Sequence, residues 1–160
     1  MAGPTPEPEP AVIEELLIEA SPETVFTFFI DPAEMRKWMG GHAILEPSAG
    51  GLFAVDIGGN RARGRFLELR VPERVVFTWG WEGSDSVPPG SSTVTFTFEP
   101  QGEGTLLRMI HEGLPAGEDL RHRHGWAHYL SRLTQAARGL DPGPDPHAEG
   151  SDISLHEASS

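Results

Sequence analysis

Two histidines are the side chains of this sequence best suited to chemistry. His111 closes a predicted strand on which Leu107 and Met109 share its face, so its side chain should point into the core. His122 precedes Trp126 by four residues on a predicted helix and lies beside the apolar stripe of that helix. Both imidazoles are therefore candidates to face one pocket and to act there as acid, base or hydrogen-bond donor near neutral pH. The alternative, which the sequence favours, is that each is hydrogen-bonded locally and performs no chemistry.

Other groupings of reactive side chains are weaker. His124 and His128 have the i, i+4 spacing of helical metal ligands, but no HExxH pattern accompanies them, so we expect an exposed polar face and no metal site. Arg61, Arg63 and Arg65 share one strand face and would suit an anionic head group, although a solvated strand face is the simpler interpretation. The sequence has no cysteine, no GxSxG motif and no glycine-rich phosphate loop. We therefore assign no catalytic residue and expect no cofactor.

A long helix must position His122. Over Asp119–Gly139 an apolar stripe recurs at helical spacing, made of Trp126, Leu130, Leu133 and Ala137 and widened by Tyr129 and Ala136. Acidic residues stand at its start, and Gly139 can take the left-handed conformation that ends a helix. The opposite face, expected to lie in water, carries His124, His128, Arg132 and Gln135. Because mostly strands precede this helix, the expected partner of its stripe is a curved sheet.

The segments before that helix predict an antiparallel sheet. Ser21-Pro22 and Asp31-Pro32 each signal the start of a short helix. Alternating apolar and polar residues with hairpin-length connections predict seven strands, at Ala11–Ala20, Ala43–Glu46, Leu52–Ile57, Ala62–Val71, Arg74–Glu82, Thr93–Glu99 and Thr105–His111. Phe66 and Leu67 point opposite ways, which suggests a bulge. The predicted fold class is therefore α+β, with a curved antiparallel sheet of one strand, two helices and six more strands gripping a long C-terminal helix.

Composition indicates one domain with polar tails. The 160 residues carry a net charge of −12. Residues 1–10 and 141–160 are rich in proline and acidic residues, and we expect both to be disordered and residues 11–140 to form a single domain. An acidic body argues against nucleic-acid binding, and no segment resembles a membrane span or a signal peptide. With no cysteine, the chain suits the cytoplasm.

Several motifs together resemble a known superfamily. They are Ser21-Pro22-Glu23-Thr24-Val25-Phe26, Asp31-Pro32, Trp38-Met39-Gly40, Pro72-Glu73-Arg74-Val75-Val76-Phe77-Thr78-Trp79, His111-Glu112-Gly113-Leu114 and Gly125-Trp126 followed by Leu130 and Leu133. Their order and spacing over about residues 12–139 resemble the START-like (SRPBCC, helix-grip) superfamily, in a branch similar to the C-terminal domain of the activator of the heat-shock-protein-ninety ATPase. The resemblance implies a sheet and helix that enclose an apolar cavity. Relatives bind lipids, polyketides or hormones there, and some catalyse cyclisation.

The resemblance changes how the large apolar residues are interpreted. For a domain of this size they would ordinarily fill a core, whereas a sheet bent around a helix favours a cavity. The candidate lining residues are Trp38, Phe53, Phe66, Phe77, Trp79, Trp81, Phe96, Met109, His111, His122, Trp126, Tyr129, Leu130 and Leu133. We expect a domain that binds a small hydrophobic, aromatic or lipid-like molecule, as a monomer or weak homodimer, without nucleic acid or stable membrane insertion.

Two other functions stay open at this stage. The first is a cyclase or hydrolase that uses His111 and His122 in the same cavity as acid and base groups. The second is a chaperone-interacting protein. The eukaryotic activator carries an additional N-terminal domain, which the ten residues before the first strand are too few to supply, so the family name alone does not assign that function.

Overall fold

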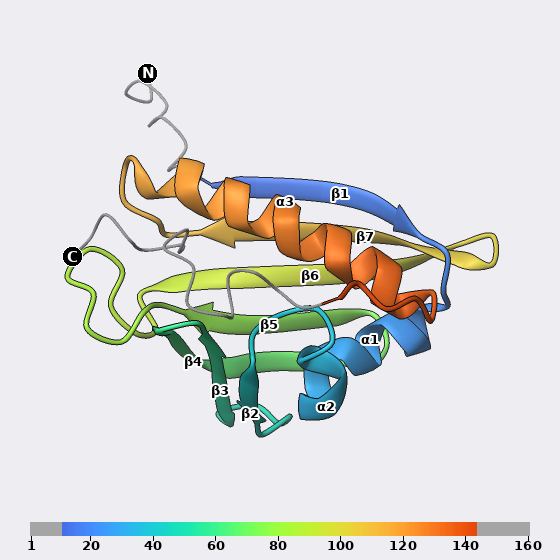
Figure 1. Ribbon diagram of the computed structural model, residues 1–160, viewed down its shortest axis with the longest axis horizontal. Coiled ribbons are helices and arrows are strands. Elements are labelled where there is room, and N and C mark those ends of the chain that lie inside the picture. The colour runs from blue at the N-terminus through green and yellow to red at the C-terminus, as the bar shows by residue number, and fades with distance from the viewer. Residues whose placement is uncertain (1–10, 144–160) are drawn as a thin grey trace, which may run out of the picture.

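The sheet of this protein has seven antiparallel strands in the order β1-β7-β6-β5-β4-β3-β2 (Figure 1). A computed structural model describes residues 11–143, so the predicted tails lie outside the described residues except for 141–143. The elements are β1 (Val12–Ile18), α1 (Pro22–Ile30), α2 (Pro32–Met35), β2 (His42–Leu45), β3 (Leu52–Ile57), β4 (Asn60–Arg70), β5 (Arg74–Trp79), β6 (Ser92–Gln101), β7 (Gly104–Glu112) and α3 (Glu118–Ala137). The predicted fold class and element order are confirmed.

The short helices begin where local hydrogen-bonding chemistry predicts. The Ser21 hydroxyl accepts a hydrogen bond from the backbone N–H of Thr24 at 3.2 Å, and Pro22 follows as the first residue of α1. Asp31 caps α2 in the same way, accepting from the backbone N–H of Ala33 at 2.9 Å. These caps set the direction in which the chain leaves β1 and place both short helices on one face of the sheet.

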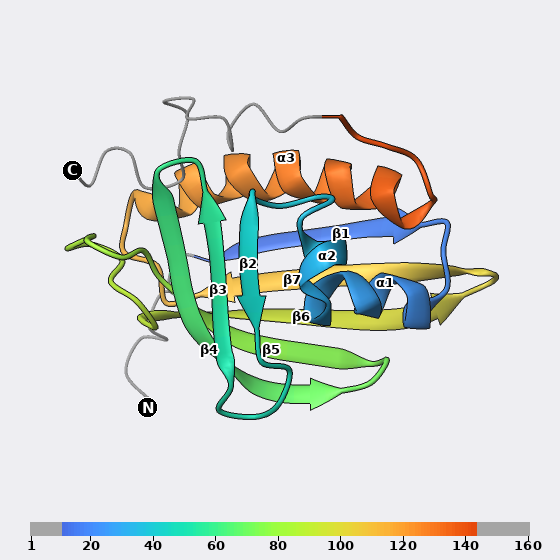
Figure 2. The same ribbon diagram turned by 60° about the horizontal axis from the view of Figure 1, so that its bottom comes forward.

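The alternation of side chains defines a concave and a convex face. On β6 the concave-facing Val94, Phe96 and Phe98 are buried, whereas the threonines between them are half-buried. The register of β4 and β5 shifts between Phe66 and Glu68, which confirms the predicted bulge. Strands β2, β3 and β4 curl away from the rest of the sheet and give it its curvature, as Figure 2 shows.

Strand β5 is shorter than predicted. It ends at Trp79 rather than Glu82, and Trp81 forms only an isolated bridge with Ala62. The reason is the loop that follows: the backbone N–H of Trp81 bonds to the carbonyl of Val87 at 2.7 Å. At Gly80 any Cβ would collide with the backbone carbonyl of Pro88. The chain therefore turns back on itself here, and Trp81 still points into the core, as its position on the strand predicts.

Helix α3 covers the concave face together with α1 and α2 (Figures 1 and 2). Its buried residues include Trp126, Leu130 and Leu133, which confirms the predicted stripe. It ends as predicted, with Gly139 at φ 83° and its N–H bonded to the Ala136 carbonyl at 2.9 Å. No helix within residues 11–143 is long and apolar enough to cross a membrane.

One residue assigned to the wet face of α3 is buried instead. Arg132 is only 8% exposed. Its guanidinium donates to the backbone carbonyls of Trp38 at 3.2 Å, Pro142 at 3.4 Å and Gly143 at 2.8 Å. Helical periodicity correctly puts Arg132 off the main stripe, but the end of α2 and the chain after α3 approach that side and enclose it. The prediction of a solvated Arg132 is therefore wrong.

The bonds of Arg132 generate a test of its structural role. Replacing Arg132 with Met keeps the apolar stem but leaves three carbonyls without their donor. We expect the free energy of unfolding to fall by about 1–3 kcal/mol, the cost of unpaired buried polar groups. Urea denaturation measures this change.

Arg138→Met is the matched control, because Arg138 caps the C-terminus of the same helix and forms an exposed ion pair with Glu19 at 3.6 Å. Its loss should cost less than about 1 kcal/mol. Equal effects of the two substitutions would contradict the structural role of Arg132.

Candidate functional site

The predicted lining residues all lie between the sheet and the helices or along the inner face of the sheet. None of them is more than 3% exposed. Their rings contact one another: Phe53 stacks on Phe77 with centroids 4.0 Å apart, Trp126 lies 5.3 Å from Trp79, and Phe96 lies 5.8 Å from Trp126. The structure thus brings the aromatic candidates together as a closely packed set.

Trp38 belongs to a different part of this aromatic set. It packs at 5.2 Å against Phe29 of α1, and its indole N–H donates to the Phe28 carbonyl at 3.0 Å. This buried hydrogen bond joins α1 to the residues that follow α2. Since its polar atom is satisfied by backbone, Trp38 is a structural anchor at this end of the core.

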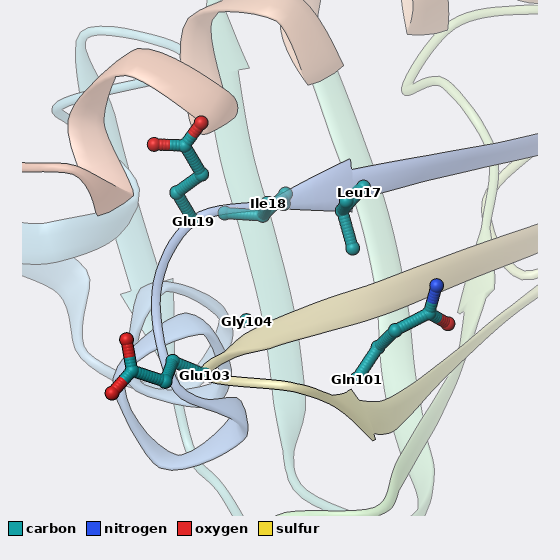
Figure 3. Close-up of a pocket in the computed structure, with 6 residues that line it drawn as sticks. All are labelled: Leu17, Ile18, Glu19, Gln101, Glu103 and Gly104. Atoms are coloured by element: carbon teal, nitrogen blue, oxygen red, sulfur yellow. The ribbon is translucent and has the colours of Figure 1, made fainter.

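A pocket of about 450 Å³ lies elsewhere, beyond the end of β1 and beside the β6–β7 turn (Figure 3). It is lined by Leu17, Ile18, Glu19, Gln101, Glu103 and Gly104. None of the predicted lining residues takes part in this pocket. The internal cavity between the sheet and α3 therefore stays a prediction.

His111 and His122 meet between the end of β7 and the start of α3. Their ring centroids are 5.1 Å apart and the rings are perpendicular. His122 receives a hydrogen bond at Nε2 from the indole N–H of Trp81 at 3.1 Å, and its Nδ1 lies 2.8 Å from the Glu118 carbonyl oxygen. His111 receives one at Nδ1 from the indole N–H of Trp126 at 3.0 Å, and its Nε2 lies 2.8 Å from the Ser92 hydroxyl. The prediction that both face inward is confirmed by their complete burial.

These partners determine where the imidazole protons sit. An indole N–H only donates, so the nitrogen it contacts must be an unprotonated acceptor. His122 consequently carries its proton on Nδ1 and donates it to the Glu118 carbonyl. The Ser92 hydroxyl donates to the Trp79 carbonyl at 2.8 Å, so His111 carries its proton on Nε2 and donates it to Ser92. Both histidines are neutral in this arrangement, and all four of their nitrogens are paired.

The environment of His111 keeps it neutral. Burial is the larger cause and the proximity of His122 the smaller, and together they hold the pKa of His111 well below its usual value of 6.5. A second proton on His111 would also place two N–H donors face to face at Trp126. Proton transfer at this imidazole near neutral pH is therefore opposed both by solvation and by geometry.

Ser92 beside His111 resembles a nucleophile with its base, a pairing that sequence reasoning missed. Ser92 precedes Val94 by two residues, so it lies on the same inward face of β6. That alternation is the sequence signal that would have revealed it. A general base must accept the serine proton at Nε2, whereas here Nε2 is the protonated nitrogen. As arranged, the pair is a structural hydrogen bond between β6 and β7.

The indole N–H of Trp79, close to these histidines, is not paired in this way. Trp79 is fully buried, and within residues 11–143 its Nε1 has no hydrogen-bond partner. Trp81, Trp126 and His111 surround the ring, with centroids at 5.2, 5.3 and 6.0 Å. An unpaired buried N–H costs about 1–3 kcal/mol, so an acceptor placed at this donor would stabilise the folded protein.

The remaining charged candidates have local partners. Arg63 pairs with Asp56 at 2.9 Å, and both Arg63 and Arg61 approach Glu82 at 3.6 and 3.2 Å. Arg65 donates to the Gly50 carbonyl at 3.0 Å. These contacts fit the simpler interpretation of that strand face. His124 is exposed, His128 packs at 4.7 Å on the ring of Tyr129, and residues 11–143 contain no group of three or more potential ligands for a metal ion.

Comparisons with known proteins give consistent matches. A family model described as Activator of Hsp90 ATPase homolog 1-like protein matches residues 19–138. The human protein named Activator of 90 kDa heat shock protein ATPase homolog 1 is 33% identical over 110 residues, which cover 68% of this chain and 31% of that protein. The chain thus spans about a third of the length of the curated relatives it matches.

Solved structures match over most of the chain. The solution structure of an AHSA1-like protein from Rhizobium etli is 48% identical with a TM-score of 0.69, covering 85% of this chain and 86% of that one. An Aha1 dimer from Colwellia psychrerythraea has a TM-score of 0.71 at 18% identity, covering 84% and 98% of the two chains. The second likeness shows the shared fold alone.

The lowered pKa of His111 predicts how stability depends on pH. Because the folded pKa lies below the unfolded value of 6.5, the unfolded chain binds the proton first. The stability that His111 contributes by staying neutral is fully present above about pH 6.5. It is lost as the pH falls below that value, and the free energy of unfolding then decreases by up to about 1.4 kcal/mol per pH unit. Urea midpoints between about pH 5 and 7.5 measure the slope.

His111→Gln should flatten this slope whatever its effect on the midpoint, whereas His124→Gln, at an exposed position, should not. Other ionisable side chains near His111 include His122, at 5.1 Å between ring centroids, and Glu118, 4.0 Å from His122. An unchanged slope in His111→Gln would show that another group is responsible.

Trp126 provides a test of the assigned tautomer. Trp126→Phe keeps an aromatic ring against Phe96 but removes the donor to His111 Nδ1, so stability should fall by about 1–3 kcal/mol. Nitrogen-15 NMR of the imidazole should then show the Nδ1 resonance shifted by the loss of its donor, whereas Nε2, still bonded to Ser92, keeps its proton. Trp126→Ala, which also leaves a void, should cost about 3–5 kcal/mol.

Trp38→Phe is the control for this experiment, because its indole donates to the Phe28 carbonyl instead of to a histidine. It should lower stability without moving the His111 resonances. A Trp126→Phe protein whose His111 nitrogens keep their wild-type shifts would refute the assignment.

Proposed function

Because this chain belongs to the family of Activator of Hsp90 ATPase homolog 1-like proteins, we propose that it is a small-molecule-binding domain whose ligand lies between the sheet and α3. The family membership confirms the resemblance inferred from the sequence, and the helix-grip fold is the one that resemblance implies. Neither assigns a ligand, since one fold hosts many functions. The proposal therefore depends on the site itself.

The observation that carries the proposal is the unpaired indole N–H of Trp79. It lies fully buried among rings, at the point where β5 faces α3 and the histidine pair. A ligand oxygen that accepts this hydrogen bond would remove the cost of the unpaired donor and gain a bond in an apolar environment. Binding requires the neighbouring rings to move apart. They can do so because no covalent bond links these side chains to one another.

The surroundings define the class of ligand. The walls are aromatic, including Trp81, Trp126 and Phe53, so a flat aromatic or lipid-like molecule gains the most contact. The low pKa of His111 leaves no positive charge there at neutral pH to neutralise an acid. We therefore propose an uncharged ligand that carries a carbonyl or ether oxygen, bound in a cytoplasmic protein.

A matched pair of probes tests this proposal. 9-Fluorenone and fluorene share a flat tricyclic shape, but only fluorenone has a carbonyl oxygen. We expect both to quench tryptophan fluorescence saturably and fluorenone to bind more tightly. Trp79→Phe should weaken fluorenone about tenfold, equivalent to about 1.4 kcal/mol, and leave fluorene unchanged.

The movement of the Trp79 indole N–H resonance on adding fluorenone is a second readout that does not depend on quenching. Equal weakening of both probes would mean that Trp79 contributes only shape. The absence of saturable binding for these and for acyl compounds would remove the ligand-binding proposal.

The second candidate function is that of a chaperone cofactor, favoured by the name and the 33% identity of the human relative. That relative is about three times as long as the matched segment, so its activity is a proposal for this chain. Stoichiometric co-purification with a 90 kDa heat-shock protein, together with a change in its ATPase rate, would support this function. Because such binding uses surface residues, it should survive Trp79→Phe.

A cyclase or hydrolase using His111 and His122 is the least supported of the three functions. It needs Nε2 of His111 free to accept a proton, and the hydrogen bond from Trp126 opposes that. Recovery of a chemically changed ligand after incubation would reinstate it.

A further inference from the structure

The convex face of the sheet carries an uncovered patch at its β1–β7 end. The three helices within residues 11–143 lie on the concave side (Figures 1 and 2). Ile13 and Leu17 of β1 project from the convex face and are 54% and 53% exposed, and the half-buried Leu106 and Ile110 of β7 lie beside them. We use the name outer patch for six residues: Ile13, Glu15, Leu17, Leu106, Arg108 and Ile110.

The register of the two strands arranges this patch in three rows. Ile13 lies opposite Ile110, Glu15 opposite Arg108, and Leu17 opposite Leu106. One acid–base row is thus flanked on each side by an apolar row. Within residues 11–143 neither Glu15 nor Arg108 forms an ion pair, although both are exposed.

We infer that the outer patch is an interface between two copies of this chain. Consider a two-fold axis that runs parallel to the strands, midway between β1 and β7. It places the β1 residues of one copy over the β7 residues of the other and keeps each row facing the same row. Glu15 then meets Arg108 of the partner subunit, and Arg108 meets Glu15 of the partner subunit. Each apolar row meets the same apolar row of the copy, as an isologous contact requires. The strands of the two sheets run nearly aligned, which is a common arrangement of stacked sheets.

Charge decides among the ways of pairing two copies. An axis perpendicular to the strands would place Glu15 against Glu15, and edge-to-edge pairing through β1 would bring Glu14 and Glu15 of both copies together. Like charges at either contact are unfavourable. The parallel axis converts the same residues into two ion pairs across the interface, so the patch is complementary to itself in one orientation only.

The size of the patch predicts a weak dimer. Two strands of half-exposed residues bury much less than the roughly 800 Å² per partner of a stable interface. We therefore expect a dissociation constant on the order of 0.1 mM, with the association weakened by salt because part of it is electrostatic.

Sedimentation equilibrium of the full chain between about 10 µM and 1 mM tests the interface across that dissociation constant. Glu15→Arg and Arg108→Glu should each weaken dimerisation at least tenfold, since each places like charges together. The double substitution restores opposite charges and should return the dissociation constant to within about threefold of wild type. Leu17→Lys should also abolish the dimer. Circular dichroism would check that each variant is folded.

Leu67→Lys and Val71→Lys are matched controls, because these residues are 52% and 65% exposed but lie outside the outer patch. They should leave the dissociation constant unchanged. A chain that stays monomeric to 1 mM would overturn the inference, as would a dimer that tolerates the single charge substitutions. A double substitution as weak as the single ones would overturn the predicted orientation.

Discussion

The hydrogen bond from the Trp126 indole to His111 is the contact on which the interior of this protein depends. It joins α3 to β7 inside the core, and His111 continues it to Ser92 of β6. His122 and Trp81 make a second such bond between α3 and the segment that follows β5. Buried polar groups are stable only when paired, so these bonds specify how the helix sits on the sheet in a way that apolar packing alone does not.

The same bonds determine what the site can do. Since indoles only donate, they hold the two histidines in opposite tautomers and leave neither with a free lone pair for a substrate. The walls around the histidines are mostly aromatic, and within residues 11–143 the indole N–H of Trp79 has no hydrogen-bond partner there. Such an environment suits recognition of an uncharged molecule better than proton transfer. Catalysis would require this network to be broken first.

The two faces of the sheet have different roles. The concave face uses aromatic residues to hold α3 and the short helices, and it encloses the candidate site. Within the described residues the convex face carries no helix, and at its β1–β7 end the apolar and charged rows of the outer patch are exposed in a regular arrangement. The proposed ligand and the proposed second copy would therefore use opposite faces of the sheet, so neither would obstruct the other.

Much of the fold could be predicted because its signals are local. Alternation along β6 and β7 predicts which side chains face inward, including His111, and helical spacing does the same for His122 and Trp126. Ser21 and Asp31 predict the helix starts through hydrogen bonds that span two or three residues. The motifs predicted the family, which the comparisons confirm.

Only the tertiary structure decided which side chains meet. Trp81 and His122 are 41 residues apart, and Arg132 is 94 residues from the Trp38 carbonyl it bonds. The tautomers of the histidines, the partners of Ser92 and the burial of Arg132 all depend on such distant contacts. Periodicity in the sequence reports the side of an element on which a residue lies. The packing of the elements determines which residue contacts that side. The free energy of a buried polar group depends on whether that residue can form a hydrogen bond with it.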